Sequence, residues 1–280
     1  MTYRRKSGSS GWVPAVIAVA VIAAVGGYVA WRAAQPGAGA GPAPASTATA
    51  ASSAPAPAAT IRHPIAQAAV PAPASTAPLP ALDDSDASVR SALVALGGDG
   101  LKDLLLPQSV VNHIVATVDA LPRHELGSSF ILPLRTPRGV FRTAETQGIL
   151  TADAGNAGRY APYMAVVQHV DPQALVAWYV HCYPLFQQAW RELGYPRSYF
   201  NDRLIVAIDD MLAAPAPAQP PALQLEKGHY VYVDPALESL SVGQKLMLRL
   251  GPANEAVLKA RLRTIRDLLT ARPPSTAPAH

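Results

Sequence analysis

Two aspartates in the later part of the chain have a spacing that glycoside chemistry could use. Asp202 and Asp209 lie seven residues apart in a stretch with helical periodicity, which corresponds to about 10.5 Å along a helix axis. Glycoside hydrolysis needs two carboxyl groups that flank a cleft, roughly 5–10 Å apart. The pair therefore predicts, as one alternative, a cell-envelope hydrolase. Helix capping is the competing interpretation for Asp202, because a negative charge is favourable in the first turn of a helix.

Tyrosine is the second source of candidate chemistry. A tyrosine offers a flat apolar face with a polar tip, and this combination suits the binding of peptides or glycans. The sequence predicts a binding groove formed by Tyr160, Tyr163 and Tyr179, with Arg142 as a charged neighbour. The alternative is that these tyrosines pack in the core with their hydroxyls hydrogen-bonded. The later half of the domain contains Tyr160, Tyr163, Tyr179, Tyr183, Tyr195, Tyr199, Tyr230 and Tyr232.

Patterns typical of metal sites and of nucleophilic catalysis are missing. Asp83, Asp84 and Asp86 lack the alternating acids, the glycine and the distal glutamate of a calcium loop, so helix capping explains them better. Cys182 is the only cysteine, and its neighbour His181 would not face it on a helix. Neither an H-E-x-x-H pair nor a G-x-S-x-G turn occurs. The sequence predicts no catalytic residue, no metal and no cofactor.

The net charge of +4 divides into two unlike parts. The residues before position 79 contain no acid and carry a charge of +5, whereas the rest of the chain sums to −1. A nearly neutral domain has no basic excess for phosphates, so nucleic-acid binding is not expected. The basic side chains before position 79 are Arg4, Arg5, Lys6, Arg32 and Arg62.

Residues 12–31 have the length and composition of a membrane helix. The segment reads WVPAVIAVAVIAAVGGYVAW, contains no charge and would span roughly 30 Å as a helix. Trp12, Tyr28 and Trp31 lie where interfacial aromatics are expected. Basic residues 4–6 precede it, and the positive-inside rule places the amino terminus in the cytoplasm. We predict a single-pass anchor in the inner membrane. A cleaved signal peptide, the alternative, usually has a shorter apolar region.

The rest of the chain divides by composition into a linker, a domain and a tail. Residues 32–78 are rich in alanine and proline, which predicts a disordered linker after the cytoplasmic residues 1–11 and the membrane segment. Residues 79–272 are long enough for one core and form the predicted periplasmic domain. A second disordered stretch, residues 273–280, follows. The predicted fold class is therefore mainly α, with a few short strands.

Capping residues and apolar periodicity locate the helices of this domain. A first helix follows the acids at 83–86 and ends at Gly97-Gly98, and a second runs from Pro107 to position 121. Others cover 157–170, 171–194, 201–211, 241–250 and 253–269, and Pro184 predicts a kink or break near His181–Tyr183. Ser198 or Asn201 would cap the 201–211 helix. Residues 130–134, 139–143 and 147–151 are short strands or an irregular loop, and 223–226 with 230–233 form a hairpin.

Four segments resemble a known bacterial family. They read LPALDDSDASVRSAL, IVATVDAL, YPRSYFNDRLIVAIDDML and SVGQKLMLRLGPANEAVLKARLRTIR. In this order, over about residues 79–269, they resemble the family catalogued as domain of unknown function 3014. The most specific parts are FNDRLIxAID (200–209) and SxGQKLxLRxGPxN (241–254). The resemblance implies a cytoplasmic start, one membrane helix, a linker and a domain, and it brings no known activity.

The leading functional prediction is a non-enzymatic binding or scaffold module of the cell envelope. The membrane segment would contact lipid, and the periplasmic domain would bind a periplasmic protein or an envelope glycan. The hydrolase built on Asp202 and Asp209 is the alternative.

Overall fold

The computed structural model describes residues 60–70, 78–126 and 132–271. Within these ranges the chain is mainly helical with a few short strands, which confirms the predicted fold class. The predicted membrane helix, most of the linker and the tail after residue 271 lie outside the described residues. None of the helices in the described ranges is both long and apolar enough to cross a bilayer.

The α-helices are α2 (Asp86–Gly97), α3 (Asp99–Leu104), α4 (Val110–Ala120), α5 (Ala161–His169), α6 (Pro172–Glu192), α7 (Phe200–Leu212), α8 (Pro235–Glu238), α9 (Val242–Leu250) and α10 (Pro252–Thr270). Three short 3-10 helices accompany them: η1 (Ile65–Gln67), η2 (Leu82–Asp84) and η3 (Ala154–Tyr160). The strands are β1 (Thr143–Thr146), β2 (Ile149–Ala152), β3 (Leu223–Glu226) and β4 (His229–Tyr232).

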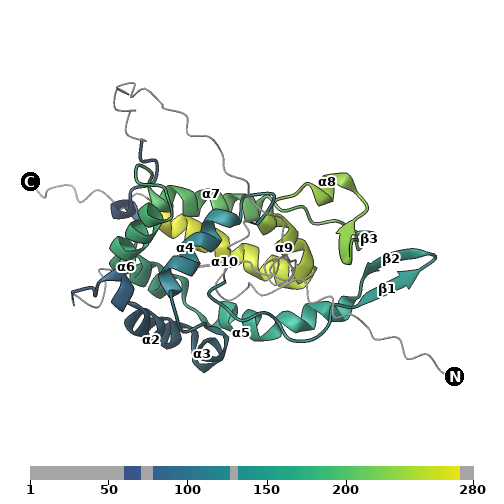
Figure 1. Ribbon diagram of the computed structural model, residues 1–280, viewed down its shortest axis with the longest axis horizontal. Helices are drawn as coiled ribbons and strands as arrows, with labels where there is room; N and C mark the ends of the chain where they lie inside the picture. The colour runs from purple at the N-terminus through teal and green to yellow at the C-terminus, as the bar shows by residue number, and fades with distance from the viewer. Residues whose placement is uncertain (1–59, 71–77, 127–131, 272–280) are drawn as a thin grey trace, which may run out of the picture.

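Helix α4 lies in the middle of the helical bundle. It packs against α2, α6 and α7, and α10 covers both α6 and α7 (Figure 1). Its sequence explains this position, because Val111, Ile114, Val115 and Val118 are all at most 2% exposed. The longest helix, α6, adds an aromatic cluster in which Phe186 stacks on Phe200 of α7, with ring centroids 5.8 Å apart. One contiguous apolar core thus joins the bundle helices.

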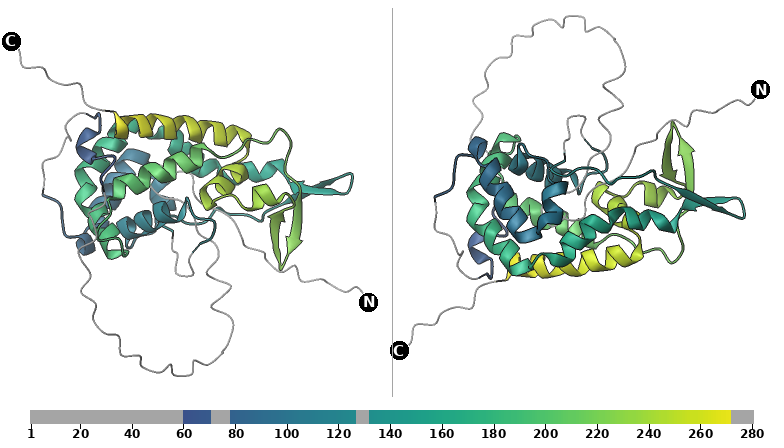
Figure 2. Two further views of the ribbon diagram at one scale, coloured as in Figure 1. Left: turned by 90° about the horizontal axis from the view of Figure 1, so that it is seen from above. Right: turned by 90° about the horizontal axis from the view of Figure 1, so that it is seen from below.

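Two antiparallel hairpins lie at one end of the molecule's long axis (Figure 2). Each closes through a two-residue turn in which both residues have positive φ: Gln147-Gly148 and Lys227-Gly228. Turns of this kind match the twist of the strands they join. The two hairpins also meet each other, since Thr151 of β2 forms an isolated bridge with Ala222, just before β3.

Several predicted boundaries are confirmed. Helices α9 and α6 begin where predicted: Ser241 and Gln244 form a capping box at the start of α9, and Asp171 caps α6 by accepting a hydrogen bond from the amide of Ala174 at 2.7 Å. Gly251 and Pro252 separate α9 from α10 as predicted. The hairpin predicted over 223–233 is present with a shift of one residue at β4.

Other boundaries differ from the predictions because side chains distant in sequence decide them. Helix α4 begins at Val110 rather than at Pro107, because the Asp86 carboxylate accepts hydrogen bonds from the amides of Ser109 and Val110 at 2.7 and 2.8 Å. The amide of Phe200 donates to the Gln187 side chain at 2.9 Å, so neither Ser198 nor Asn201 caps α7.

The break alternative near residues 181–183 of α6 is wrong, and of the alternatives for the segments before β1, strand or irregular loop, the described residues 132–134 and 139–142 form no strand. Helix α6 continues through Pro184, which points to solvent, while its buried neighbours on both sides hold the helix in the core. The first hairpin pairs 143–146 with 149–152, because residues 147 and 148 form the turn. Leu134 makes only an isolated bridge, with Leu105.

Residues 60–70 belong to the helical domain, although the predicted linker included them. The amides of Arg62 and His63 donate to the Asp202 carboxylate at 3.1 and 2.7 Å, and the Asn201 side chain donates to the His63 carbonyl at 2.8 Å. Further on, the amide of Ala69 donates to the carbonyl of Leu268 in α10. These bonds fix the segment at the end of the bundle opposite the hairpins (Figures 1 and 2).

Candidate functional site

The predicted carboxylate pair does not form a hydrolytic site. Asp202 accepts hydrogen bonds from the backbone of residues 62 and 63, so the docked segment occupies its carboxylate. Asp209 is exposed and forms an ion pair with Arg266, at 2.5 Å from Nε. A carboxylate that holds structure and another on an open surface do not flank a cleft. The geometry therefore gives no support to the hydrolase.

The predicted tyrosine groove is not present at the surface. Tyr160 and Tyr163 are each 2% exposed and Tyr179 is 6% exposed, whereas Arg142 is exposed beside the first hairpin. Burial raises the pKa of both Tyr160 and Tyr163 to about 12. The Tyr163 hydroxyl donates to the Arg135 carbonyl at 2.9 Å, and the Tyr179 hydroxyl donates to Asn201 at 3.3 Å. These three tyrosines are core residues. Their rings are buried in the apolar interior, and the hydroxyls of Tyr163 and Tyr179 have hydrogen-bond partners.

The remaining predicted features have structural roles. Cys182 is 5% exposed, and burial raises its thiol pKa to about 11, which leaves it protonated and unreactive at neutral pH. Asp86 caps α4, in agreement with the capping interpretation, although it acts on a different helix from the one predicted. Across the described ranges, no group of three or more histidine, cysteine, aspartate or glutamate side chains is arranged to hold a metal ion.

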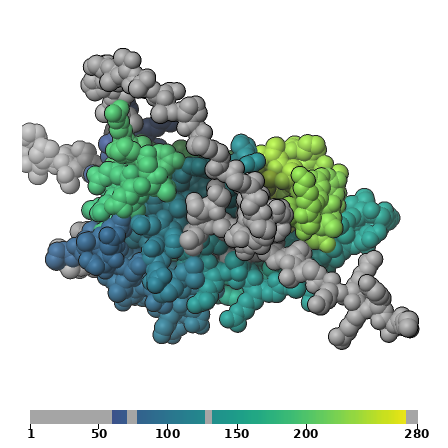
Figure 3. Space-filling model, in the orientation of Figure 1, coloured from purple at the N-terminus to yellow at the C-terminus, as the bar shows by residue number. Residues whose placement is uncertain are grey.

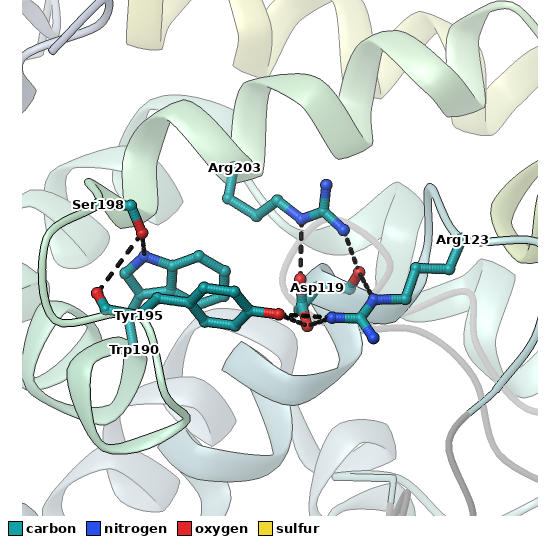
Figure 4. A network of polar contacts seen from close by, with 6 residues as sticks. All are labelled: Asp119, Arg123, Trp190, Tyr195, Ser198 and Arg203. Carbon is teal, nitrogen blue, oxygen red and sulfur yellow. Dashed lines mark hydrogen bonds and ion pairs between the residues drawn. The ribbon is translucent and has the colours of Figure 1, made fainter. Parts of the chain in front are cut away.

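A polar network around Asp119 joins three parts of the bundle (Figure 4). Asp119, at the end of α4, accepts a hydrogen bond from Arg203 Nε of α7 at 3.0 Å and pairs with Arg123. The hydroxyl of Tyr195 donates to the same carboxylate at 3.2 Å. The Tyr195 ring stacks on Trp190 with centroids 3.9 Å apart. Because both oxygens of this 6%-exposed carboxylate are engaged, the network holds the helices together.

A pocket of about 300 Å³ opens at the hairpin end of the molecule. The two hairpins, the proline-rich loop 216–221, the end of α9 and the start of α10 surround it. Figure 3 shows the yellow-green surface of the second hairpin and α8 next to the teal surface of the first hairpin at this end. Aromatic rings from the two hairpins meet here, because Phe141 and Tyr230 have centroids 5.6 Å apart. Apolar and aromatic lining includes Phe141, Leu223, Tyr230, Tyr232, Leu248, Pro217, Pro220 and Pro221.

Strand register determines which face of the second hairpin lines the pocket. Leu223 lies opposite Tyr232, and Leu225 lies opposite Tyr230. Directly opposed residues and residues two apart share one face of a hairpin, so these four side chains form a single apolar face. Leu223, Tyr230 and Tyr232 line the pocket, while Leu225 extends the face outward and is 62% exposed.

The two acids that line the pocket already have partners. The Asp153 carboxylate accepts a hydrogen bond from the amide of Gly155 at 2.8 Å. Glu255 is 5% exposed in the first turn of α10, and its Oε1 lies 2.8 Å from Lys259 Nζ, an ion pair by distance rather than an aligned hydrogen bond. Lys259 also donates to the carbonyl of Ala214 at 2.6 Å, which fixes the pair at the base of the pocket.

Arg249 is the cation of the pocket that remains available to a ligand. It extends from the last turn of α9, and within the described residues it forms no ion pair with a carboxylate. Burial raises the pKa of the Tyr232 hydroxyl, which also lines the pocket, and the guanidinium of Arg249 lowers that pKa in part. An apolar wall with one arginine suits a ligand that combines an apolar group with a negative charge.

Residues of the 241–254 motif have two roles: some stabilise the fold and others line the pocket. In the 241–254 motif, Ser241 caps α9, and Gly243 leaves room for neighbours that a Cβ would meet at 3.0–3.2 Å. The later part of the same motif supplies Arg249, Gly251 and Pro252 to the pocket. Sequence reasoning missed the pocket. A possible signal was the arginine that precedes the Gly251-Pro252 helix junction.

The fold and pocket define a mainly helical domain with two hairpins around a small, largely apolar pocket. Residues 110–266 match the family described as "Protein of unknown function (DUF3014)", and the chain belongs to this family, as the sequence motifs predicted. No curated protein and no solved structure matches the chain.

Proposed function

We propose that the protein is a binding module of the cell envelope, anchored in the inner membrane by residues 12–31 and non-enzymatic. The pocket between the hairpins carries this proposal, because it combines aromatic walls with an available arginine, whereas the candidate catalytic carboxylates are engaged elsewhere. The uncharged segment and the basic residues before it support a cytoplasmic amino terminus and a periplasmic domain.

The position of the pocket suits a tethered module. The docked residues 60–70, through which the chain enters the described domain, lie at one end of the bundle, and the hairpins lie at the other (Figure 2). The pocket would therefore point away from the point of entry, and the alanine- and proline-rich residues would set its reach from the membrane.

Of the two partner classes, we propose a periplasmic protein rather than an envelope glycan. Sugar hydroxyls need several side-chain donors and acceptors, and the wall is built largely from leucine, proline, alanine and aromatic rings. The exposed Leu225 next to the pocket adds apolar surface of the kind that protein partners cover.

Photocrosslinking in intact cells tests this proposal. A photoreactive phenylalanine analogue at position 141, in the pocket wall, is expected to give an adduct with a periplasmic protein. The matched control places it at position 206 on α7, where Val206 is 44% exposed and does not line the pocket. Equal adducts from both positions, or none from position 141, would contradict the proposed site. A fusion tests the proposed topology, a cytoplasmic amino terminus and a periplasmic domain. Alkaline phosphatase fused after residue 272 should be active, because this enzyme is active only in the periplasm.

A further inference from the structure

We infer that the pocket binds the carboxy-terminal residue of the partner protein, with an apolar side chain against the hairpins and the free α-carboxylate paired with Arg249. This inference rests on the proposed binding function and names the chemistry by which the partner is recognised. It follows from the size of the pocket, its one available cation and the apolar face that continues beyond it.

The size of the pocket favours a single residue. Its volume of about 300 Å³ lies at the lower end of the roughly 300–1,000 Å³ that ligand pockets span. The rings of Phe141 and Tyr230 offer a flat surface on which one apolar or aromatic side chain can pack. A chain that continued through the pocket in both directions would need more room, whereas a chain that ends there does not.

The charges of the pocket favour a carboxylate. Neither acid of the wall forms an ion pair with Arg249, because Asp153 accepts the amide of Gly155 and Glu255 pairs with Lys259. An arginine presents two parallel N–H donors that match a carboxylate, and such a pair is stronger than a neutral hydrogen bond. The wall beside Arg249 is largely apolar, which reduces the competition from water for that bond.

The exposed part of the hairpin face favours a polypeptide over a free small acid. Leu225 shares a face with Leu223 and Tyr230 but extends beyond the pocket, and it is 62% exposed. A small acid inside the pocket would leave Leu225 in water. The residues that precede a bound carboxy terminus could cover it, which accounts for an apolar side chain at this exposed position.

A matched pair of probes tests the role of the carboxylate without any mutation. The probes are N-acetyl-Leu-Phe with a free carboxylate and the same dipeptide as its carboxamide. Binding to the full chain in lipid nanodiscs would be measured by saturation-transfer difference NMR, with empty nanodiscs as the blank. We expect the free acid to bind at least about tenfold more tightly than the amide, as one charge-assisted pair implies.

Variants then assign that preference to its residues. Arg249→Gln should weaken binding of the free acid far more than binding of the amide, so that the difference between the two probes is lost, and Arg249→Lys should restore part of that difference. Tyr230→Ala should weaken both probes. Arg263→Gln is the matched control, because Arg263 is exposed on α10 and does not line the pocket. A third probe, 3-phenylpropionate, represents a free small acid and should bind more weakly than the dipeptide acid.

The outcomes separate the inference from the proposed function. Equal binding of acid and amide by the wild-type chain overturns the carboxylate inference but leaves the pocket as a binding site. Tighter binding of 3-phenylpropionate than of the dipeptide acid would show a small-molecule site and overturn the assignment to a polypeptide end. If neither dipeptide binds, both the inference and the pocket as the binding site are wrong.

Discussion

Replacement of Asp119 by alanine is expected to destabilise the bundle more than the loss of either of its arginines. The carboxylate receives hydrogen bonds from Arg203 of α7 and from Tyr195, which lies between α6 and α7, and it also pairs with Arg123 (Figure 4). Alanine would remove the carboxylate that Arg203, Arg123 and Tyr195 share, while both arginines would keep their hydrogen bonds to the backbone carbonyl of residue 119. The three parts of the bundle that meet there would lose the charged group that joins them.

The exposure of each partner sets the magnitude. Removal of one member of a fully buried ion pair costs about 3–5 kcal/mol. The side chains of Arg203 and Arg123 are 25% and 45% exposed and would regain water, so we expect about 2–3 kcal/mol for Asp119→Ala. For a domain of this size, that loss corresponds to a decrease in Tm of about 4–12 °C. Arg123→Ala should cost about 1 kcal/mol or less, because the pair that it breaks is largely solvated.

Urea unfolding of the full chain in detergent, followed by near-ultraviolet circular dichroism, measures these free energies of unfolding. The double variant with Arg203→Ala completes a cycle whose coupling energy should lie at about 1–3 kcal/mol. If Asp119→Ala changes the free energy of unfolding by less than about 0.5 kcal/mol, the network does not hold the helices together. A cost for Arg123→Ala equal to that of Asp119→Ala would refute the argument from exposure.

Three further predictions concern other parts of the domain. Gly243→Ala should lower the free energy of unfolding by about 1–3 kcal/mol, because its Cβ would lie 3.0 Å from Met211 and 3.2 Å from the Leu121 carbonyl; an unchanged urea midpoint would contradict this. Burial lowers the pKa of His113 below 6.5, so its imidazole binds a proton more readily in the unfolded chain than in the folded one. The stability that is present above about pH 6.5 should therefore be lost as the pH falls toward the pKa of the folded state. His113→Gln should flatten that part of the stability–pH curve, and an identical curve would refute the assignment. Asp202→Ala should speed amide hydrogen exchange in residues 60–70 with little effect on α4, whereas unchanged exchange would show that other contacts hold the segment.

Sequence reasoning succeeded where local chemistry sets the structure. The capping box of Ser241, the cap by Asp171 and the Gly251-Pro252 junction each depend on residues within a few positions of one another. The same holds for the second hairpin, whose strands flank a two-residue turn. Composition and motif order were enough to indicate a mainly helical domain and its family.

Sequence reasoning failed where a distant side chain competes with a local signal. Pro107 is a good first residue for a helix, but Asp86, more than twenty residues earlier in the chain, fixes the start of α4 at Val110. The tyrosines at 160, 163 and 179 have the chemistry of a binding surface, and only packing shows that they are interior. Asp202 looked like a catalytic acid, but it accepts the amides of residues about 140 positions away.

The sequence by itself therefore determined most of the helices, the second hairpin and the caps of α6 and α9, because these depend on hydrogen bonds and φ preferences between near neighbours. The tertiary structure alone decided that residues 60–70 join the domain and that the tyrosines are buried. It also decided that Arg249 faces an apolar pocket between two hairpins. These features depend on which segments meet in space, and the side chains that meet there come from β strands, a loop and two helices spread over more than a hundred residues.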